Sequence, residues 1–150
     1  MTEEIMNTAI QSEIQSRDFY AKMAARVSNR RGKRRLERLS QEEEGHRQLL
    51  ARRFRSRYSR EFTLAADADI APQFDFRSTD VFDRMEAMEA VSVAISAEKQ
   101  SIAFYAGQLE SASDDEERRL LRSLVKMENA HKDRLQQEHA RLDRRFYWSS

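Results

Sequence analysis

Apolar residues recur at three- and four-residue steps along four stretches of this chain, which is the spacing of one face of an α-helix. The pattern predicts helices over about residues 2–27, 33–57, 79–111 and 113–144. The inward positions of the first two are Ile5, Met6, Ala9, Ile10, Phe19, Tyr20, Met23 and Val27, then Leu36, Leu39, Leu49, Leu50 and Phe54. Those of the last two are Val81, Phe82, Met85, Met88, Val91, Ile95, Ile102, Tyr105 and Leu109, then Leu120, Leu121, Leu124, Met127, Leu135 and Leu142. An all-α protein is therefore expected.

The breaks between the helices indicate how they are joined. The first pair is separated by a turn around Asn29 and Gly32, and the second by a turn in which Ser113 and Glu116 have the spacing of a capping box. Between the pairs lies an irregular stretch, about residues 59–78, which contains Pro72. Its roughly 20 residues reach about 60 Å when extended, which exceeds the length of one helix. We therefore predict a four-helix bundle with a long crossover between helices 2 and 3.

The two halves of the chain repeat one another, since adding 85 to a residue number in the first half gives an equivalent position in the second. Each half carries a lone glutamate followed, at the same distance in both halves, by a Glu-x-x-His motif. The six residues are Glu13, Glu43 and His46 in the first half and Glu98, Glu128 and His131 in the second. The same offset pairs Ala9 with Ala94, Ile10 with Ile95, Phe19 with Phe104, Tyr20 with Tyr105, Leu36 with Leu121, Leu39 with Leu124 and Leu50 with Leu135. We predict one domain, residues 1–150, made of duplicated hairpins at about 1–58 and 79–145 with the crossover at about 59–78.

The matched residue types indicate a metal site inside the bundle. A Glu and a His three residues apart lie on one face of a helix, so each motif can hold one ion. Glu13 and Glu98 lie among apolar helix positions that point inward. Four ionised carboxylates in an apolar core need compensation, which two divalent cations supply. Oxygen and nitrogen donors without sulfur suit iron or manganese and tolerate zinc. We predict two iron ions, with manganese or zinc as substitutes.

Other polar residues near the motifs have more ordinary interpretations. A single Glu-x-x-His motif is usually a solvated helix face, and we interpret Glu42 and Glu44 in that way, so the metal prediction depends on the repeat, the spacing and the turns together. His139 corresponds to a phenylalanine in the first half and is expected at the surface or its boundary. Tyr20 and Tyr105 lie two turns after the lone glutamates, where each could support a ligand carboxylate by a hydrogen bond or be a half-buried core tyrosine.

Composition argues against several other classes of function. The chain carries 27 basic and 26 acidic residues, a net charge of +1, so nothing indicates a nucleic-acid partner. It has no cysteine, which excludes disulfides, thiolate metal sites and an iron–sulfur or rubredoxin-type centre within these residues. No apolar run approaches the roughly 20 residues of a membrane span, and the acidic start of the sequence lacks the layout of a signal peptide. We expect a cytoplasmic protein with no membrane partner.

On these motifs the chain resembles the ferritin-like di-iron carboxylate superfamily, and within it the rubrerythrin-type (erythrin) proteins. The resemblance covers nearly the whole chain and is carried by Glu13…Glu43-Glu44-Gly45-His46 and Glu98…Glu128-Asn129-Ala130-His131. It implies a ferritin-like four-helix bundle in which Glu43 and Glu128 bridge two irons. It further implies that Glu13 and His46 complete one iron, and that Glu98 and His131 complete the other. Tyr20 and Tyr105 match tyrosines that support the ligands in that family.

The chain departs from typical rubrerythrins in two ways. It carries no rubredoxin domain, and Ser101 stands where those proteins have an additional glutamate three residues after the helix-3 ligand. Ser16 is the equivalent residue in the first half. The symmetric set of six ligands is in this respect more similar to the centres of bacterioferritin and ferritin.

The resemblance implies a di-iron oxidoreductase that reduces hydrogen peroxide or oxygen, with the six predicted ligands as its catalytic residues. Its partners would be an external electron donor and the small oxidant. The alternatives are a ferroxidase or iron-handling protein, a di-iron hydroxylase of an organic substrate, and a non-catalytic helical module that uses metal only for structure. Family analogy also implies a homodimer. Its candidate contacts are Phe74, Phe76 and the Phe146-Tyr147-Trp148 tail, which could instead cover the chain's own core.

Overall fold

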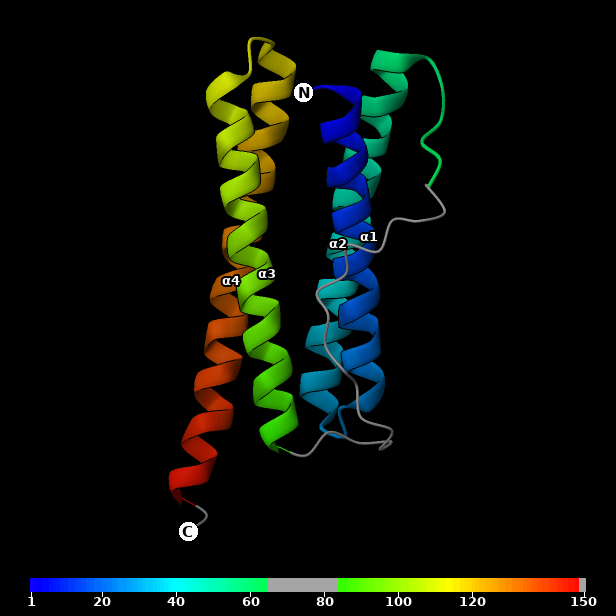
Figure 1. Cartoon of the computed structure of the whole chain (residues 1–150). Helices are drawn as coiled ribbons and strands as arrows, with labels where there is room; N and C mark the ends of the chain where they lie inside the picture. The colour runs from blue at the N-terminus through cyan, green and yellow to red at the C-terminus, as the bar shows by residue number, and fades with distance from the viewer. Residues whose placement is uncertain (65–83, 149–150) are drawn as a thin grey trace.

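Long helices make up nearly all of the chain that the structure describes (Figure 1). The computed structural model describes residues 1–64 and 84–148, with side chains for residues 1–64 and 86–144. In this part of the chain the helices are α1 (Glu3–Arg26), α2 (Arg30–Tyr58), α3 (Arg84–Ser111) and α4 (Asp115–Trp148), and no strand is present. The predicted all-α class is confirmed.

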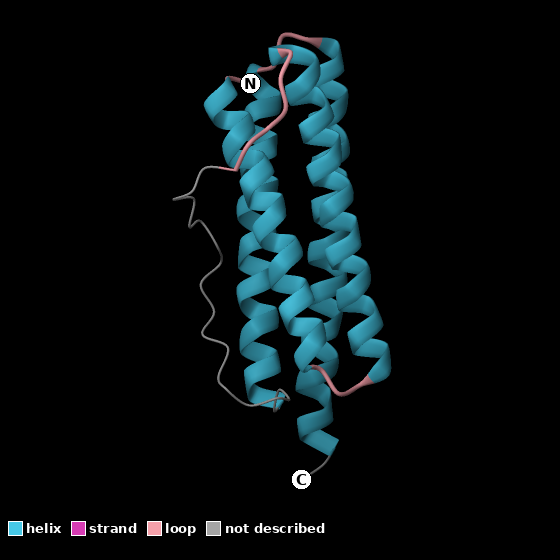
Figure 2. Cartoon of the chain, turned by 90° about the vertical axis from the view of Figure 1, so that its right-hand side faces the viewer, coloured by secondary structure: helices cyan, strands magenta, loops and turns pink. Residues whose placement is uncertain are grey.

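Two antiparallel hairpins, α1 with α2 and α3 with α4, lie side by side (Figures 1 and 2). Between the hairpins, α1 contacts α3 and α2 contacts α4. Helices α2 and α3 run in the same direction, since both start at the end of the bundle that holds the α1–α2 turn. The connection from α2 to α3 therefore joins opposite ends, as the predicted crossover requires. Most of that connection, including Pro72, Phe74 and Phe76, lies outside the described residues.

Equivalent polar residues begin the second helix of each hairpin. The Asn29 side chain accepts hydrogen bonds from the backbone N–H groups of Arg31 and Gly32, each at 3.0 Å, so α2 begins before the glycine that was expected in the turn. The Asp114 carboxylate, at the equivalent position of the second half, accepts from the backbone N–H of Glu116 at 3.0 Å. The predicted capping box with Ser113 is wrong. Helix α4 begins at Asp115, so the residue that caps it is Asp114 and not Ser113.

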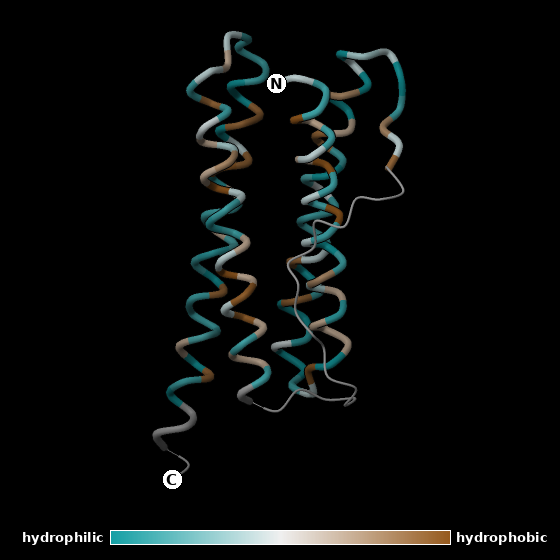
Figure 3. The backbone as a smooth tube through the Cα atoms, viewed as in Figure 1, coloured by the Kyte–Doolittle hydropathy of each residue, from teal (hydrophilic) through white to brown (hydrophobic). Residues whose placement is uncertain are grey.

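The core is divided into two apolar clusters, one toward each end of the bundle. The cluster nearer the α1–α2 turn consists of Phe19, Tyr20, Met23, Ala24, Leu36, Leu39, Ala90, Val91, Ala94 and Leu135. The cluster nearer the α3–α4 turn consists of Met6, Ala9, Ile10, Leu50, Phe54, Tyr105, Ala112, Leu121 and Leu124. Groups of apolar and polar residues follow one another along each helix (Figure 3). Recurrence of apolar residues at three- and four-residue steps places them on one face of the helix, which is the face that is buried. On every helix the predicted metal ligands lie between the members of one cluster and those of the other.

Two further features of the helices bear on the predictions. Within the described residues, no helix is long and apolar enough to cross a membrane. Helix α4 continues as far as Trp148, but the side chains of the Phe146-Tyr147-Trp148 tail lie outside the described residues.

Candidate metal centre

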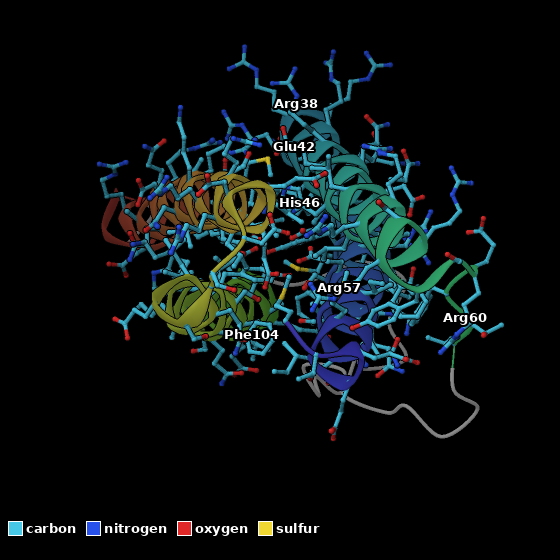
Figure 4. All side chains as sticks on the ribbon, turned by 90° about the horizontal axis from the view of Figure 1, so that it is seen from above. Arg38, Glu42, His46, Arg57, Arg60 and Phe104 are labelled. Atoms are coloured by element: carbon cyan, nitrogen blue, oxygen red, sulfur yellow. The ribbon has the colours of Figure 1, made fainter. Side chains whose placement is uncertain are left out.

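All four helices contribute to a buried layer of carboxylates and imidazoles. Helix α1 provides Glu13, α2 provides Glu43 and His46, α3 provides Glu98, and α4 provides Glu128 and His131. None of the six residues is more than 3% exposed. Viewed along the bundle, His46 is directed into the interior while Arg38 lies on the outer side of α2 (Figure 4). The structure therefore brings together every residue of the predicted ligand set.

The two Glu-x-x-His motifs meet at the centre of this layer. Glu43, His46, Glu128 and His131 each offer one ligand atom, and these atoms all lie within 4.8 Å of one another. The two imidazole rings are stacked, with centroids 5.1 Å apart and planes inclined by 14°. Ligand atoms this close, drawn from two helices of different hairpins, are within reach of shared cations.

Both bridging candidates face both histidines. One oxygen of Glu43 lies 2.9 Å from Nδ1 of His46, and the other lies 3.2 Å from Nδ1 of His131. Glu128 does the same, at 2.9 Å from His46 and 3.2 Å from His131. The lone glutamates divide between the histidines: Glu13 lies 3.3 Å from Nδ1 of His46, and Glu98 lies 3.6 Å from Nδ1 of His131. This is the arrangement that two bridging and two terminal carboxylates would require.

Several of these close contacts are not hydrogen bonds. Nδ1 of His46, one oxygen of Glu43 and both oxygens of Glu128 are buried without a hydrogen-bond partner among the described residues. Buried polar atoms are nearly always satisfied, so four orphaned atoms gathered at one place need an explanation. Three carboxylates converge on Nδ1 of His46, whereas one N–H can serve only one of them well. Carboxylate and imidazole donors in this arrangement fit a pair of metal ions.

Each of the two equivalent tyrosines holds the lone glutamate of the other hairpin. The Tyr20 hydroxyl donates to Glu98, and the Tyr105 hydroxyl donates to Glu13. Both tyrosines are at most 2% exposed, and each belongs to a different apolar cluster. They are therefore fully buried, and each closes one side of the polar layer while it fixes a carboxylate. The duplication placed the tyrosines near the glutamates, but it did not indicate that the hydrogen bonds cross between hairpins.

Glu42 contacts His131, which the interpretation of the sequence missed. Its carboxylate lies 2.9 Å from Nε2 of His131, the ring nitrogen that faces away from the other carboxylates. Arg134 donates to the same carboxylate at 3.2 and 2.5 Å. Glu42 is therefore not an ordinary solvated residue. Glu44 fits that description better, since it forms ion pairs with Arg17 and Arg47 at the surface.

Burial and mutual contact move the pKa values of the layer in different directions. Burial raises the pKa of Glu13 well above its usual range and raises that of Glu98 to about 8. Burial also tends to raise the pKa of Glu128, but its contacts with His131 and His46 outweigh burial and lower that pKa to about 2. Burial opposes charge on His46, yet the facing carboxylates, Glu128 foremost, raise its pKa to about 12. The same balance raises the pKa of His131. Without metal, protons on the groups whose pKa is raised offset part of the charge of the layer.

The remaining histidine lies elsewhere. His139 is partly exposed on α4, as expected for a residue at the boundary of the surface, and is not among the clustered ligand atoms of the described residues.

A family model described as Rubrerythrin matches residues 4–139. Among solved structures, a hypothetical protein from Pyrococcus furiosus is similar with a TM-score of 0.83 and 26% sequence identity, over 93% of this chain and 89% of that chain. CopM, solved in the Ag-bound form, is similar with a TM-score of 0.70 and 12% identity, over 93% of this chain and 95% of that chain, which is a likeness of fold alone. No curated protein matches the chain. The family match and the buried Glu/His cluster are together compatible with a di-iron site.

Proposed function

The chain belongs to the rubrerythrin family, and on that premise we propose that it is a non-haem di-iron oxidoreductase that reduces hydrogen peroxide or oxygen. The observation that carries the proposal is the placement of Glu43 and Glu128, each of which directs one oxygen toward each imidazole. Carboxylates placed in this way would hold two metal ions next to one another, and such a pair could supply the two electrons that reduction of the oxidant consumes.

The protein's own residues have distinct roles in this proposal. Glu13 with His46 and Glu98 with His131 complete the two metal positions, and the charge of two divalent ions balances the four carboxylates. When bound, two ferrous ions supply one electron each and act as Lewis acids toward the oxidant. The tyrosine hydroxyls keep the lone glutamates oriented, while the two apolar clusters exclude water from both sides of the layer.

The proposal includes an external electron donor. The chain has no cysteine, so these 150 residues encode no iron–sulfur centre that could return electrons to the metal pair. Reduction of one peroxide to two waters consumes two electrons and two protons, and a partner must supply those electrons for the next turnover.

Stopped-flow absorbance tests the proposal directly. Protein loaded anaerobically with two equivalents of Fe(II) is mixed with hydrogen peroxide, and in a second experiment with oxygen. We expect ferric absorption to appear with one peroxide consumed per two Fe(II). The Glu128→Gln variant should lose bound iron and this reaction, whereas Glu44→Gln, a surface change on the same helix face as Arg47, should keep both. Ferrous protein that stays unoxidised by either oxidant would contradict the proposal.

Ferroxidase activity is the second candidate. It is favoured by Ser101, which leaves the centre with a symmetric set of six ligands and without an additional carboxylate on α3. A ferroxidase should oxidise a large excess of Fe(II) over many turnovers and release Fe(III) from the site. An oxidoreductase with resident iron should instead stop after two Fe(II) per chain unless a separate reductant is added.

A further inference from the structure

We propose that the two metal positions are unequal, because Glu42 and Arg134 support the imidazole of His131 while no described residue gives equivalent support to His46. The inference rests on the proposed metal centre and concerns how that centre fills. It follows from comparing the two halves of the chain, in which every predicted ligand has a counterpart at the same offset.

The outer face of His131 is built from charged residues. Its Nδ1 is directed toward the ligand carboxylates, and its Nε2 lies 2.9 Å from Glu42. Arg134, one turn along α4, holds the Glu42 carboxylate through both of its terminal nitrogens. An acceptor at Nε2 keeps the proton on that nitrogen, so Nδ1 is left free to bind metal. The histidine is therefore held in the metal-binding tautomer by a carboxylate that is itself held in place.

Within the part of the chain that the structure describes, His46 has no such support on its outer face. Adding 85 to Glu42 gives Met127, and subtracting 85 from Arg134 gives Leu49. Leucine has no hydrogen-bonding atom and a methionine thioether is only a weak, uncharged acceptor, so this pair cannot replace a carboxylate held by a guanidinium. Met127 packs against the apolar cluster near the α3–α4 turn. Among the described residues, the structure records no hydrogen bond to Nε2 of His46. The six ligands are therefore equivalent in the two halves of the chain, whereas the residues at the Glu42 and Arg134 positions are not.

The expected consequence is a difference in affinity. A carboxylate behind a metal-bound histidine increases the basicity of the imidazole and fixes its orientation, and removing such a partner typically weakens metal binding by about 10- to 100-fold. The position formed by His131 and Glu98 should then bind a divalent ion more tightly than the position formed by His46 and Glu13. The two ions would be taken up in a fixed order, with the His131 position filled first. Glu42 acts in this scheme as a positioning residue.

Anaerobic titration with Co(II), followed by visible absorption and by competition with a chelator, measures both affinities without turnover. The wild-type chain should bind two ions in steps whose dissociation constants differ by about 10- to 100-fold. Glu42→Met copies the residue found in the other half and should weaken the first step until the two steps merge. Met127→Glu with Leu49→Arg transfers the support to His46 and should strengthen the weaker step. Glu44→Met, a change of the same size on the same helix, should leave both steps unchanged.

The possible outcomes separate this inference from the metal centre itself. Two ions bound with equal affinity by the wild-type chain would overturn the inference alone, and so would a difference that persists in Glu42→Met. A wild-type chain that binds no Co(II) would overturn the proposed centre and this inference with it. Circular dichroism shows whether each variant keeps its helices, and Glu42→Met alone decides the question if the double substitution does not fold.

Discussion

At the scale of single residues, the buried layer depends on hydrogen bonds that cross between the hairpins. Tyr20 and Tyr105 each donate to a carboxylate oxygen that has little access to water. Removing one partner of a buried hydrogen bond leaves the other unsatisfied and costs about 1–3 kcal/mol. Tyr20→Phe and Tyr105→Phe should therefore each lower the free energy of unfolding of the metal-free protein by about that amount, measured by urea denaturation.

The duplication supplies the control for this prediction. Since the two hydroxyls occupy equivalent places, the two variants should be destabilised to a similar extent. Phe19→Tyr adds a hydroxyl to the neighbouring aromatic residue and should not rescue Tyr20→Phe, because adjacent positions on α1 are rotated by about 100° from one another. Variants with unchanged stability would show that the tyrosines only fill space.

Protons and metal compete for the same side chains. In the metal-free chain, burial raises the pKa of Glu98 to about 8, and the carboxylates facing His46 raise its pKa to about 12. A cation must displace these protons, so metal affinity should increase with pH and binding should release protons. Titration with Co(II) in weakly buffered solution containing a pH indicator measures that release. An affinity that does not change between about pH 6 and pH 8 would contradict the prediction.

The same pKa shifts set how the metal-free protein responds to pH. The folded chain holds these protons more tightly than the unfolded chain, in which the pKa values are 4.5 for glutamate and 6.5 for histidine. The stabilising contribution of each group is therefore complete below its unfolded value. It is lost as pH rises from 4.5 through about 8 for Glu98, and from 6.5 through about 12 for His46. Metal-free protein should unfold at lower urea concentration at pH 9 than at pH 6.

At the scale of helices, sequence periodicity predicted the elements well, but it predicted the first turns of α2 and α4 less well. The apolar faces and the offset between the halves are properties of whole helices, so an error of a few residues does not disturb them. A helix start depends instead on a single side chain that reaches a backbone N–H. Asn29 and Asp114 are equivalent and both do this, so the offset itself could have identified Asp114 in preference to Ser113.

Glu42 could not be identified in that way. Its partners, His131 and Arg134, belong to the other half of the chain, and its own counterpart is a methionine. The repeat therefore carried no signal for it. The residues directly before and after Glu43 are both rotated by about 100° around α2, in opposite senses. Only the packing of α2 against α4 shows that Glu42 is the one that meets the other hairpin.

One glycine in α2 offers a simple gain in stability. A Cβ added at Gly45 would meet no heavy atom within 4 Å, and glycine inside a helix costs about 1 kcal/mol relative to alanine. Gly45→Ala should therefore raise the free energy of unfolding by about that amount without altering metal content. Gly32→Ala is the matched control, because its Cβ would lie 3.2 Å from a methyl group of Val27 and the gain should be smaller. Thermal denaturation compares the two.

At the scale of the whole molecule, the metal centre adds to the connection between the two hairpins. Both apolar clusters contain residues from both hairpins, and the six predicted ligands lie between these clusters and also come from both hairpins. Bound metal should therefore stabilise the fold as a whole. For each of the two positions, free Co(II) at about 1,000 times the dissociation constant of that position should add about 4 kcal/mol to the free energy of unfolding. A chain carrying both Glu43→Gln and Glu128→Gln should gain nothing from the metal, which urea denaturation can measure.

Assembly and cellular location stay predictions at this scale. The expected homodimer depended on aromatic residues whose side chains lie outside the described residues, at Phe74, Phe76 and the C-terminal tail. Analytical ultracentrifugation of the purified protein would show whether it forms a dimer.

The division of the ligands between hairpins also bears on the origin of the chain. Either hairpin by itself supplies only three of the six ligands, so an ancestral polypeptide of half the length could have built this centre only as a pair of identical copies. Fusion of two such genes would have released the copies from having to match. Glu42 and Met127 are then one of the positions at which the two copies have diverged, and the proposed difference in affinity would be a product of that divergence.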